Sequence, residues 1–139
     1  MFEILVVDDI AGFRFALTEA LTPLGCKVVS APNVATALQC YAEQSFDLII
    51  SDYSMPGGTG MDLLREVRRI ERRQPFILMS ADLPRGVARE AQLHGACVFE
   101  KHDAMERVPE AFAAGSGDPL YELFCAPHQP ALVLEAARG

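Results

Sequence analysis

Five short runs of apolar and β-branched residues recur along the 139-residue chain. They cover residues 4–7, 27–30, 48–50, 76–79 and 97–99. Because the runs are mostly continuous rather than alternating, they are typical of strands that are buried on both faces of a parallel sheet. We therefore predict five strands in a single sheet.

The segments between these runs carry helical periodicity. Phe13, Leu17, Leu21 and Leu24 share one face of a first helix, which we expect Gly25 to end. The second and third helices have good N-caps. We expect Asn33 to cap a helix with Val34, Ala37, Leu38 and Tyr41 facing inward, and Thr59 to cap one with Leu63, Leu64, Val67 and Ile70 on the core side.

The last two predicted helices are less regular. One runs from about residue 85 to 94 and is closed by Gly95, and the other follows Asp103. Pro109 removes a backbone donor from that last helix, so we expect it to be short or kinked. The resulting βαβαβαβαβα order predicts an α/β fold with a doubly wound parallel sheet and right-handed crossovers.

Composition limits the number of domains. Half of the residues are hydrophobic, which is enough for one core of ordinary size. The turn-forming stretch 115–119 separates a predicted domain at 1–114 from a tail at 115–139. The tail is too apolar for a solvated linker, and it either folds back on the domain or serves a partner or second subunit.

Charge and hydropathy narrow the classes of partner. A net charge of −7 disfavours binding to nucleic-acid phosphates. No apolar run approaches the roughly 20 residues needed to span a membrane, so we expect a cytoplasmic protein. The one basic cluster suits the negative end of the third helix. It comprises Arg68, Arg69, Arg72 and Arg73.

The cysteines do not form a recognisable functional motif. Cys26, Cys40, Cys97 and Cys125 are widely spaced and include no CxxC pair. We interpret them as structural thiols, most of them buried among apolar neighbours.

The ends of the predicted strands are polar. Asp8 and Asp9 follow the first strand, Asp52 the third, Ser80 the fourth and Lys101 the fifth. Ligands collect at the carboxyl ends of the strands in open parallel sheets. A single aspartate at such a place is most often a helix cap. Three carboxylates that meet at short range need a cation, and oxygen ligands of this kind suit Mg²⁺.

In their order and spacing these residues resemble the receiver domains of two-component response regulators, the CheY-like superfamily. The resemblance runs from about residue 3 to 112 and rests on residues 4–9, 47–56 and 79–82, with Gly60 eight positions after Asp52. It implies a flavodoxin-like (βα)5 fold, with five parallel strands in the order 2-1-3-4-5.

The same resemblance implies roles for the strand-end residues. Asp52 would accept a phosphoryl group from a phosphohistidine on a sensor histidine kinase or a histidine phosphotransfer protein. Mg²⁺ would be bound by Asp9 directly, by Asp8 mainly through water, by the Asp52 carboxylate and by the backbone carbonyl of Ser54. Lys101 would contact the phosphoryl oxygens.

Other residues would tune this chemistry. The hydroxyl of Ser80 would bind a phosphoryl oxygen and draw in the loop that follows it, which switches protein–protein interactions. Ala81 leaves space beside the phosphate. Ser54 and Asp82 occupy positions that influence how quickly water removes the phosphoryl group, and we hypothesise that Asp82 orients that water.

The chain departs from the family pattern after the fifth strand. His102 stands where a proline, often cis, is usual, so we expect a trans bond, with His102 facing solvent. Val98 occupies the usual aromatic position and Phe99 the next one. Either Phe99 takes over the aromatic role or, as we favour, it belongs to the core.

The function we predict is phosphorylation-based signalling, with self-phosphotransfer and autodephosphorylation but no turnover of an external substrate. The alternative is a receiver-like interaction module that works without phosphorylation. A Mg²⁺-dependent phosphatase is disfavoured, because those enzymes typically place two aspartates two residues apart after the first strand, whereas Asp8 and Asp9 are adjacent. A homodimer is a further option.

Overall fold

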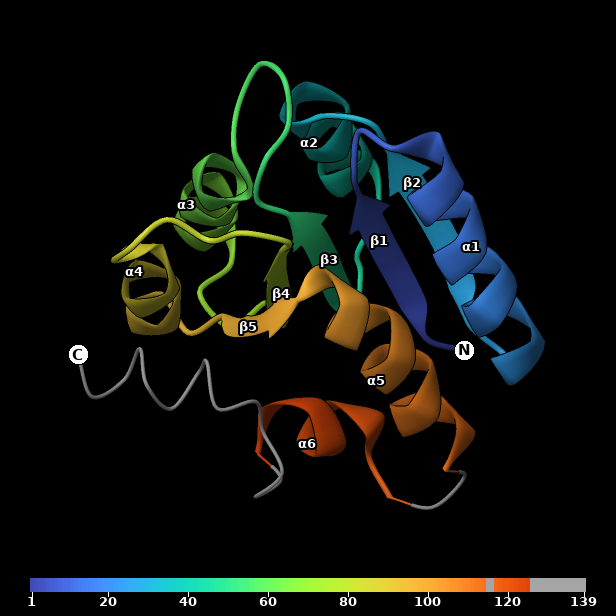
Figure 1. The fold of residues 1–139 in the computed structure, drawn as a ribbon. Coiled ribbons are helices and arrows are strands. Elements are labelled where there is room, and N and C mark those ends of the chain that lie inside the picture. The colour runs from blue at the N-terminus through green and yellow to red at the C-terminus, as the bar shows by residue number, and fades with distance from the viewer. Residues whose placement is uncertain (115–116, 126–139) are drawn as a thin grey trace.

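The computed structural model describes residues 1–114 and 117–125. Five parallel strands form one sheet in the order β2-β1-β3-β4-β5, as predicted. Figure 1 shows the sheet between its helices. The strands are β1 (Glu3–Val7), β2 (Lys27–Ala31), β3 (Leu48–Asp52), β4 (Phe76–Ser80) and β5 (Cys97–Glu100).

Helices cover both faces of the sheet. The helices are α1 (Ala11–Leu21), α2 (Val34–Glu43), α3 (Gly60–Ile70), α4 (Val87–Leu93), α5 (Lys101–Ala113) and α6 (Pro119–Phe124), with a short 3₁₀ turn at Thr22–Leu24. α1, α5 and α6 pack on one face, and α2, α3 and α4 pack on the other. The predicted doubly wound fold is therefore confirmed. No helix in the described ranges combines the length and apolarity needed to cross a membrane.

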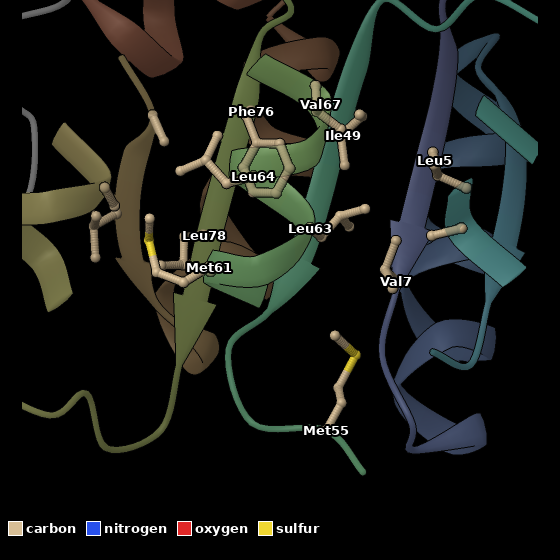
Figure 2. Packing of buried hydrophobic residues seen from close by; sticks show 14 of the residues in the cluster. Leu5, Val7, Ile49, Met55, Met61, Leu63, Leu64, Val67, Phe76 and Leu78 are labelled. Atoms are coloured by element: carbon tan, nitrogen blue, oxygen red, sulfur yellow. The ribbon is translucent and has the colours of Figure 1, made fainter. Parts of the chain in front are cut away.

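The two cores follow from the alternation of side chains along each strand. Leu5, Ile49 and Leu78 point to the α2–α3–α4 face, where they meet Leu63 and Leu64 of α3 (Figure 2). Their neighbours in sequence point to the other face, toward α1 and α5. Strands β3 and β4 are buried along their whole length, which explains their continuous apolar sequence. The edge strand β2 is partly exposed.

The N-caps predicted for the second and third helices are present in the structure. The Asn33 side chain accepts a hydrogen bond from the Thr36 backbone N–H at 2.8 Å. Thr59 and Asp62 form a reciprocal capping box, which satisfies two backbone donors at the start of α3. At the other end of α3, Arg68 and Arg69 lie in the last turn, as expected.

Two predicted core residues are exposed instead. α1 ends at Leu21, and Pro23 lies in the 3₁₀ turn that follows, so Leu24 leaves the buried face and is 38% exposed. Ile70 is the last residue of α3 and is 67% exposed, so the buried face of the helix ends at Val67. Gly25 adopts the left-handed conformation that ends this segment, as the sequence indicated.

The final helix of the main domain differs from the prediction. α5 begins at Lys101 rather than after Asp103, and its 13 residues continue through Pro109, so of the two expected outcomes, a short or a kinked helix, the short one was wrong. A proline inside a helix removes one hydrogen bond, which long flanking segments can tolerate when they are packed. Ala104 and Val108 supply that packing, since both are fully buried.

Part of the tail folds back on the domain. α6 packs against α5, and Leu123 is only 3% exposed within the core of the α1–α5 face. The apolar residues Leu132, Val133 and Leu134 lie outside the described residues. The expectation for the cysteines holds for Cys26 and Cys97, which are buried, but Cys125 is exposed.

Candidate functional site

The site forms where three strands end at the same edge of the sheet. Asp8 directly follows β1, Asp52 is the last residue of β3, and Lys101 directly follows β5. The parallel pairing of β1 with β3 sets Val7 beside Ser51, so the residues that follow them are neighbours. Carboxylate oxygens of Asp8, Asp9 and Asp52 lie within 4.8 Å of one another.

Asp8 is fixed in place and completely buried. Its Oδ1 accepts a hydrogen bond from the Ile10 backbone N–H at 2.8 Å. Its backbone N–H donates to the Ala31 carbonyl at 3.1 Å, and Arg14 Nη1 donates to its carbonyl oxygen at 2.6 Å. The Arg14 contact joins the first turns of α1 to the end of β1. We did not anticipate it, because arginines on helix surfaces are common and nothing in the sequence marks this one.

Lys101 bridges two of the acidic residues. Its Nζ lies 2.7 Å from Asp8 Oδ2 and 3.7 Å from Asp52 Oδ2. The ammonium group also lies 4.6 Å from the centre of the Phe13 ring, which is a cation–π contact. With a side chain only 15% exposed, Lys101 is the principal positive charge facing the carboxylates. The sequence placed Phe13 only in the core and gave no sign of this contact.

Asp52 holds its proton more tightly than an ordinary aspartate. Burial first, and then the Asp8 charge, raise the pKa of its carboxyl group to about 6, against the opposing effects of Lys101 and a hydrogen bond from the Tyr53 backbone. A carboxylate with an elevated pKa next to other carboxylates indicates a site at which anionic oxygens are held close together.

The loop after Asp52 is held close to the strand by Gly60. The Gly60 N–H donates to the Tyr53 carbonyl at 2.9 Å. A Cβ atom at Gly60 would lie 2.4 Å from the Asp52 carbonyl oxygen and 2.6 Å from Leu78 Cδ1. Only glycine allows α3 to begin this close to the backbone of Asp52.

Ser80 lies at the end of β4 and is 5% exposed. Its Oγ accepts a hydrogen bond from the Asp82 backbone N–H at 3.1 Å, so the hydroxyl is already coupled to the loop that follows. Ser54, Ala81 and Asp82 are exposed around the same rim.

The structure shows how the residues that depart from the family pattern after β5 are arranged. All peptide bonds of the described residues are trans, including the one before His102. His102 is exposed, as predicted, but it lies in the first turn of α5, with Nε2 3.5 Å from Glu106 Oε1. Phe99 is 2% exposed in the core of the α1–α5 face, which confirms the core interpretation, while Val98 packs on the opposite face.

The donor set fits a hard divalent cation. Three carboxylates carry more negative charge than the one ammonium group beside them can balance, and their oxygens are close enough to share an ion. Mg²⁺ prefers a few carboxylates together with water, and the exposed Asp9 leaves room for water.

Comparison with known proteins points to one family. The family model described as "Response regulator receiver domain" matches residues 4–112. The chemotaxis protein CheY of Pseudomonas aeruginosa is 36% identical over 96 residues, which are 67% of this chain and 77% of that protein. The probable chemotaxis protein CheY of Rhizobium etli is 34% identical over 119 residues, or 83% of this chain and 92% of that protein. By contrast, the matched region is only 26% of the Arabidopsis thaliana two-component response regulator ARR14.

Comparison with solved structures points to the same family. Chemotaxis protein CheY4 of Vibrio cholerae has a TM-score of 0.69 at 25% identity, covering 79% of this chain and 98% of that one. Response regulator TrrA of Thermotoga maritima, in complex with Mg²⁺ and BeF, has a TM-score of 0.61 at 30% identity, covering 72% of this chain and 85% of that one.

Proposed function

Because this chain belongs to the response regulator receiver domain family, we propose that it accepts a phosphoryl group on Asp52 from a phosphohistidine and thereby switches its contacts with other proteins. The observation that carries the proposal is the cluster of Asp8, Asp9 and Asp52 oxygens within 4.8 Å of one another, with Lys101 against two of them. Receiver domains act in phosphorylation-based signalling, and the specific donor and the cation are the parts that we infer here.

In this proposal Asp52 is the nucleophile. A carboxylate oxygen of Asp52 attacks phosphorus, the bond from phosphorus to the donor's imidazole nitrogen breaks, and an acyl phosphate forms on Asp52. Bound Mg²⁺ would neutralise charge on the transferring phosphoryl oxygens. Asp8, Asp9, the Asp52 carboxylate and the backbone carbonyl of Ser54 are the residues that would hold it.

Lys101 and Ser80 would then contact the phosphoryl group on Asp52. The Lys101 ammonium lies 3.7 Å from the Asp52 carboxylate, so a short movement away from Asp8 brings it to the phosphoryl oxygens. The Ser80 hydroxyl would donate to another phosphoryl oxygen, and the Asp82 N–H that now bonds Ser80 Oγ would move with it. This coupling would carry the change from β4 into the loop leading to α4.

The donor that fits is a sensor histidine kinase or a histidine phosphotransfer protein. Ala81 is exposed beside Ser80 and leaves space for a bulky donor. Loss of the phosphoryl group would be hydrolysis at the same site. The exposed Asp82 carboxylate would orient the attacking water, and the lifetime of the acyl phosphate in Asp82→Ala tests this: an unchanged decay rate excludes the role.

The decisive experiment is labelling by a small donor. Wild-type protein incubated with acetyl phosphate and Mg²⁺ should gain the mass of one phosphoryl group, and Asp52→Asn should gain none. Asp47→Asn is the matched control, because Asp47 precedes the same strand and its Oδ2 accepts a hydrogen bond from the Glu3 backbone at the opposite end. Chelation of Mg²⁺ should abolish labelling. Equal labelling of Asp52→Asn and wild type would disprove the site, and no labelling of wild type would favour an interaction module that works without phosphorylation.

A further inference from the structure

A pair of cysteines lies where α6 meets the sheet. Cys97 begins β5, is 4% exposed, and its thiol donates a hydrogen bond to the Leu123 carbonyl oxygen at 3.4 Å. Cys125 follows Leu123 by two residues, is the C-cap of α6 and is exposed. The Cys97 thiol therefore points at the turn of chain that carries Cys125.

A groove and an electrostatic effect also connect the surroundings of the two thiols. Gly95, two residues before Cys97, lines the same groove of about 360 Å³ as Cys125. Burial is the main cause that raises the pKa of the Cys97 thiol to about 11; a hydrogen bond from the Val98 backbone opposes the rise and the charge of Cys125 contributes to it. The Coulomb energy of two charges falls as their separation grows, so this influence is consistent with two thiols that lie in the same region of the fold.

The other two cysteines are not arranged in this way. Cys26 packs in the core on the α1–α5 face, and Cys40 lies on α2 against the core on the opposite face of the sheet. The sheet separates them, so they cannot be joined without unfolding.

We propose that Cys97 and Cys125 form a redox-active pair that closes to an intramolecular disulfide under a peroxide oxidant and fastens α6 to β5. This modification site is separate from the proposed phosphoryl acceptor and does not depend on it. Oxidation would link α6 covalently to β5, and reduction by a small thiol would break that link.

The chemistry has two balanced steps. The exposed Cys125 thiolate attacks one oxygen of hydrogen peroxide, the O–O bond breaks, and a sulfenic acid forms as the departing hydroxide takes up a proton to become water. Cys97 sulfur then attacks the sulfenic sulfur, the S–O bond breaks, and the disulfide forms with release of a second water. Two thiols are oxidised and one peroxide is reduced. The second step is slow because Cys97 holds its proton tightly, so the sulfenic acid should persist long enough to be trapped.

The test uses the full chain. The purified, reduced protein is treated with hydrogen peroxide, and its peptides are mapped without reduction. We expect a peptide linking Cys97 to Cys125, loss of two of the four free thiols, and recovery of both with dithiothreitol. With dimedone present from the start, the adduct should form on Cys125 and not on Cys97.

Two variants test whether the cross-link is specific to Cys97 and Cys125 or reflects general oxidation of cysteines. Cys125→Ser replaces an exposed thiol and should retain its fold, yet it should lose the cross-link and keep all three remaining thiols reduced. A Cys26→Ser, Cys40→Ser double variant should form the cross-link as wild type does. The peptide map of the oxidised wild-type protein involves no substitution, so a misfolded variant cannot obscure whether the cross-link forms. Disulfide-linked dimers through Cys125, or oxidised Cys125 with Cys97 still free, would overturn the proposal.

Discussion

A buried charge at Asp52 opposes folding when no cation is bound. Its carboxyl pKa of about 6 compares with 3.8 for an unperturbed aspartate, so between about pH 4 and pH 6 the folded state binds more protons than the unfolded state. Stability therefore falls as pH rises through this window, and the full penalty applies above it. We predict that Asp52→Asn stabilises the metal-free protein at pH 7 by about 1–3 kcal/mol.

Urea unfolding in the presence of a chelator measures this effect. The gain should shrink as pH falls through this window and approach zero below about pH 3, where Asp52 is protonated in both states. Mg²⁺ should also reduce it at pH 7 by stabilising the wild type. A gain that is the same at pH 4 and pH 7 would show that the charge of Asp52 is not its cause.

Lys101 stabilises the fold through Asp8. Its Nζ lies 2.7 Å from Asp8 Oδ2, and Asp8 is completely buried. Lys101→Met keeps the length of the side chain but leaves that carboxylate unpaired, so we expect a loss of roughly 3 kcal/mol in the metal-free protein. Lys27→Met is the matched control, because the Lys27–Glu3 pair is solvent-exposed and should contribute below about 1 kcal/mol. Chemical denaturation of both variants provides the comparison, and equal losses would contradict the assignment.

At the scale of elements, the start of α3 limits the position of Asp52. Gly60→Ala would bring a Cβ within 2.4 Å of the Asp52 carbonyl oxygen, and backbone atoms cannot move aside easily. We predict a loss of about 2–3 kcal/mol in unfolding free energy and slower labelling by acetyl phosphate. Gly12→Ala is the control: a Cβ there meets nothing within 4 Å, and alanine in α1 should stabilise by about 0.5–1 kcal/mol. Similar stability of the two variants would exclude the steric explanation.

The sequence predicted the elements where local and tertiary effects agree. Asn33 and Thr59 cap their helices because capping depends on a few neighbouring residues. Leu24 and Ile70 were misplaced because the apolar spacing continues to the end of a helix or beyond it, where the side chains are exposed. α5 continues through Pro109 because its buried face outweighs one lost hydrogen bond, and no local rule measures that balance.

The candidate site could be predicted only in outline. Polar residues at strand ends predict that Asp8, Asp9 and Asp52 meet, because the carboxyl ends of parallel strands share one edge. Which carboxylate Lys101 contacts more closely depends on side-chain directions across different strands. Likewise, the Arg14 and Phe13 contacts arise from how α1 lies on the sheet, and spacing along the chain does not encode them.

At the scale of the whole molecule, α6 extends one of the two cores. The matched family region ends at residue 112, so α6 lies beyond it, yet Leu123 reaches the core on the α1–α5 face. β5 is at the edge of the sheet, and the thiol of its first residue, Cys97, bonds the backbone of α6. We therefore regard α6 as part of the fold of this chain rather than a separate tail.

This view predicts an unequal effect of two substitutions in α6. Leu123 is 3% exposed and Tyr121 is 56% exposed on the same helix. Leu123→Ala removes a buried side chain and leaves a cavity, so it should lower the unfolding free energy by about 2–4 kcal/mol, whereas Tyr121→Ala should change it by less than about 1 kcal/mol. Urea unfolding, monitored by circular dichroism, measures the unfolding free energy of both variants. Because α6 contacts β5 near its start and the acidic cluster lies at the opposite end of the strands, labelling of Leu123→Ala by acetyl phosphate should persist wherever the variant is folded. If Leu123→Ala were as stable as Tyr121→Ala, α6 would be an appendage that contributes nothing to the core.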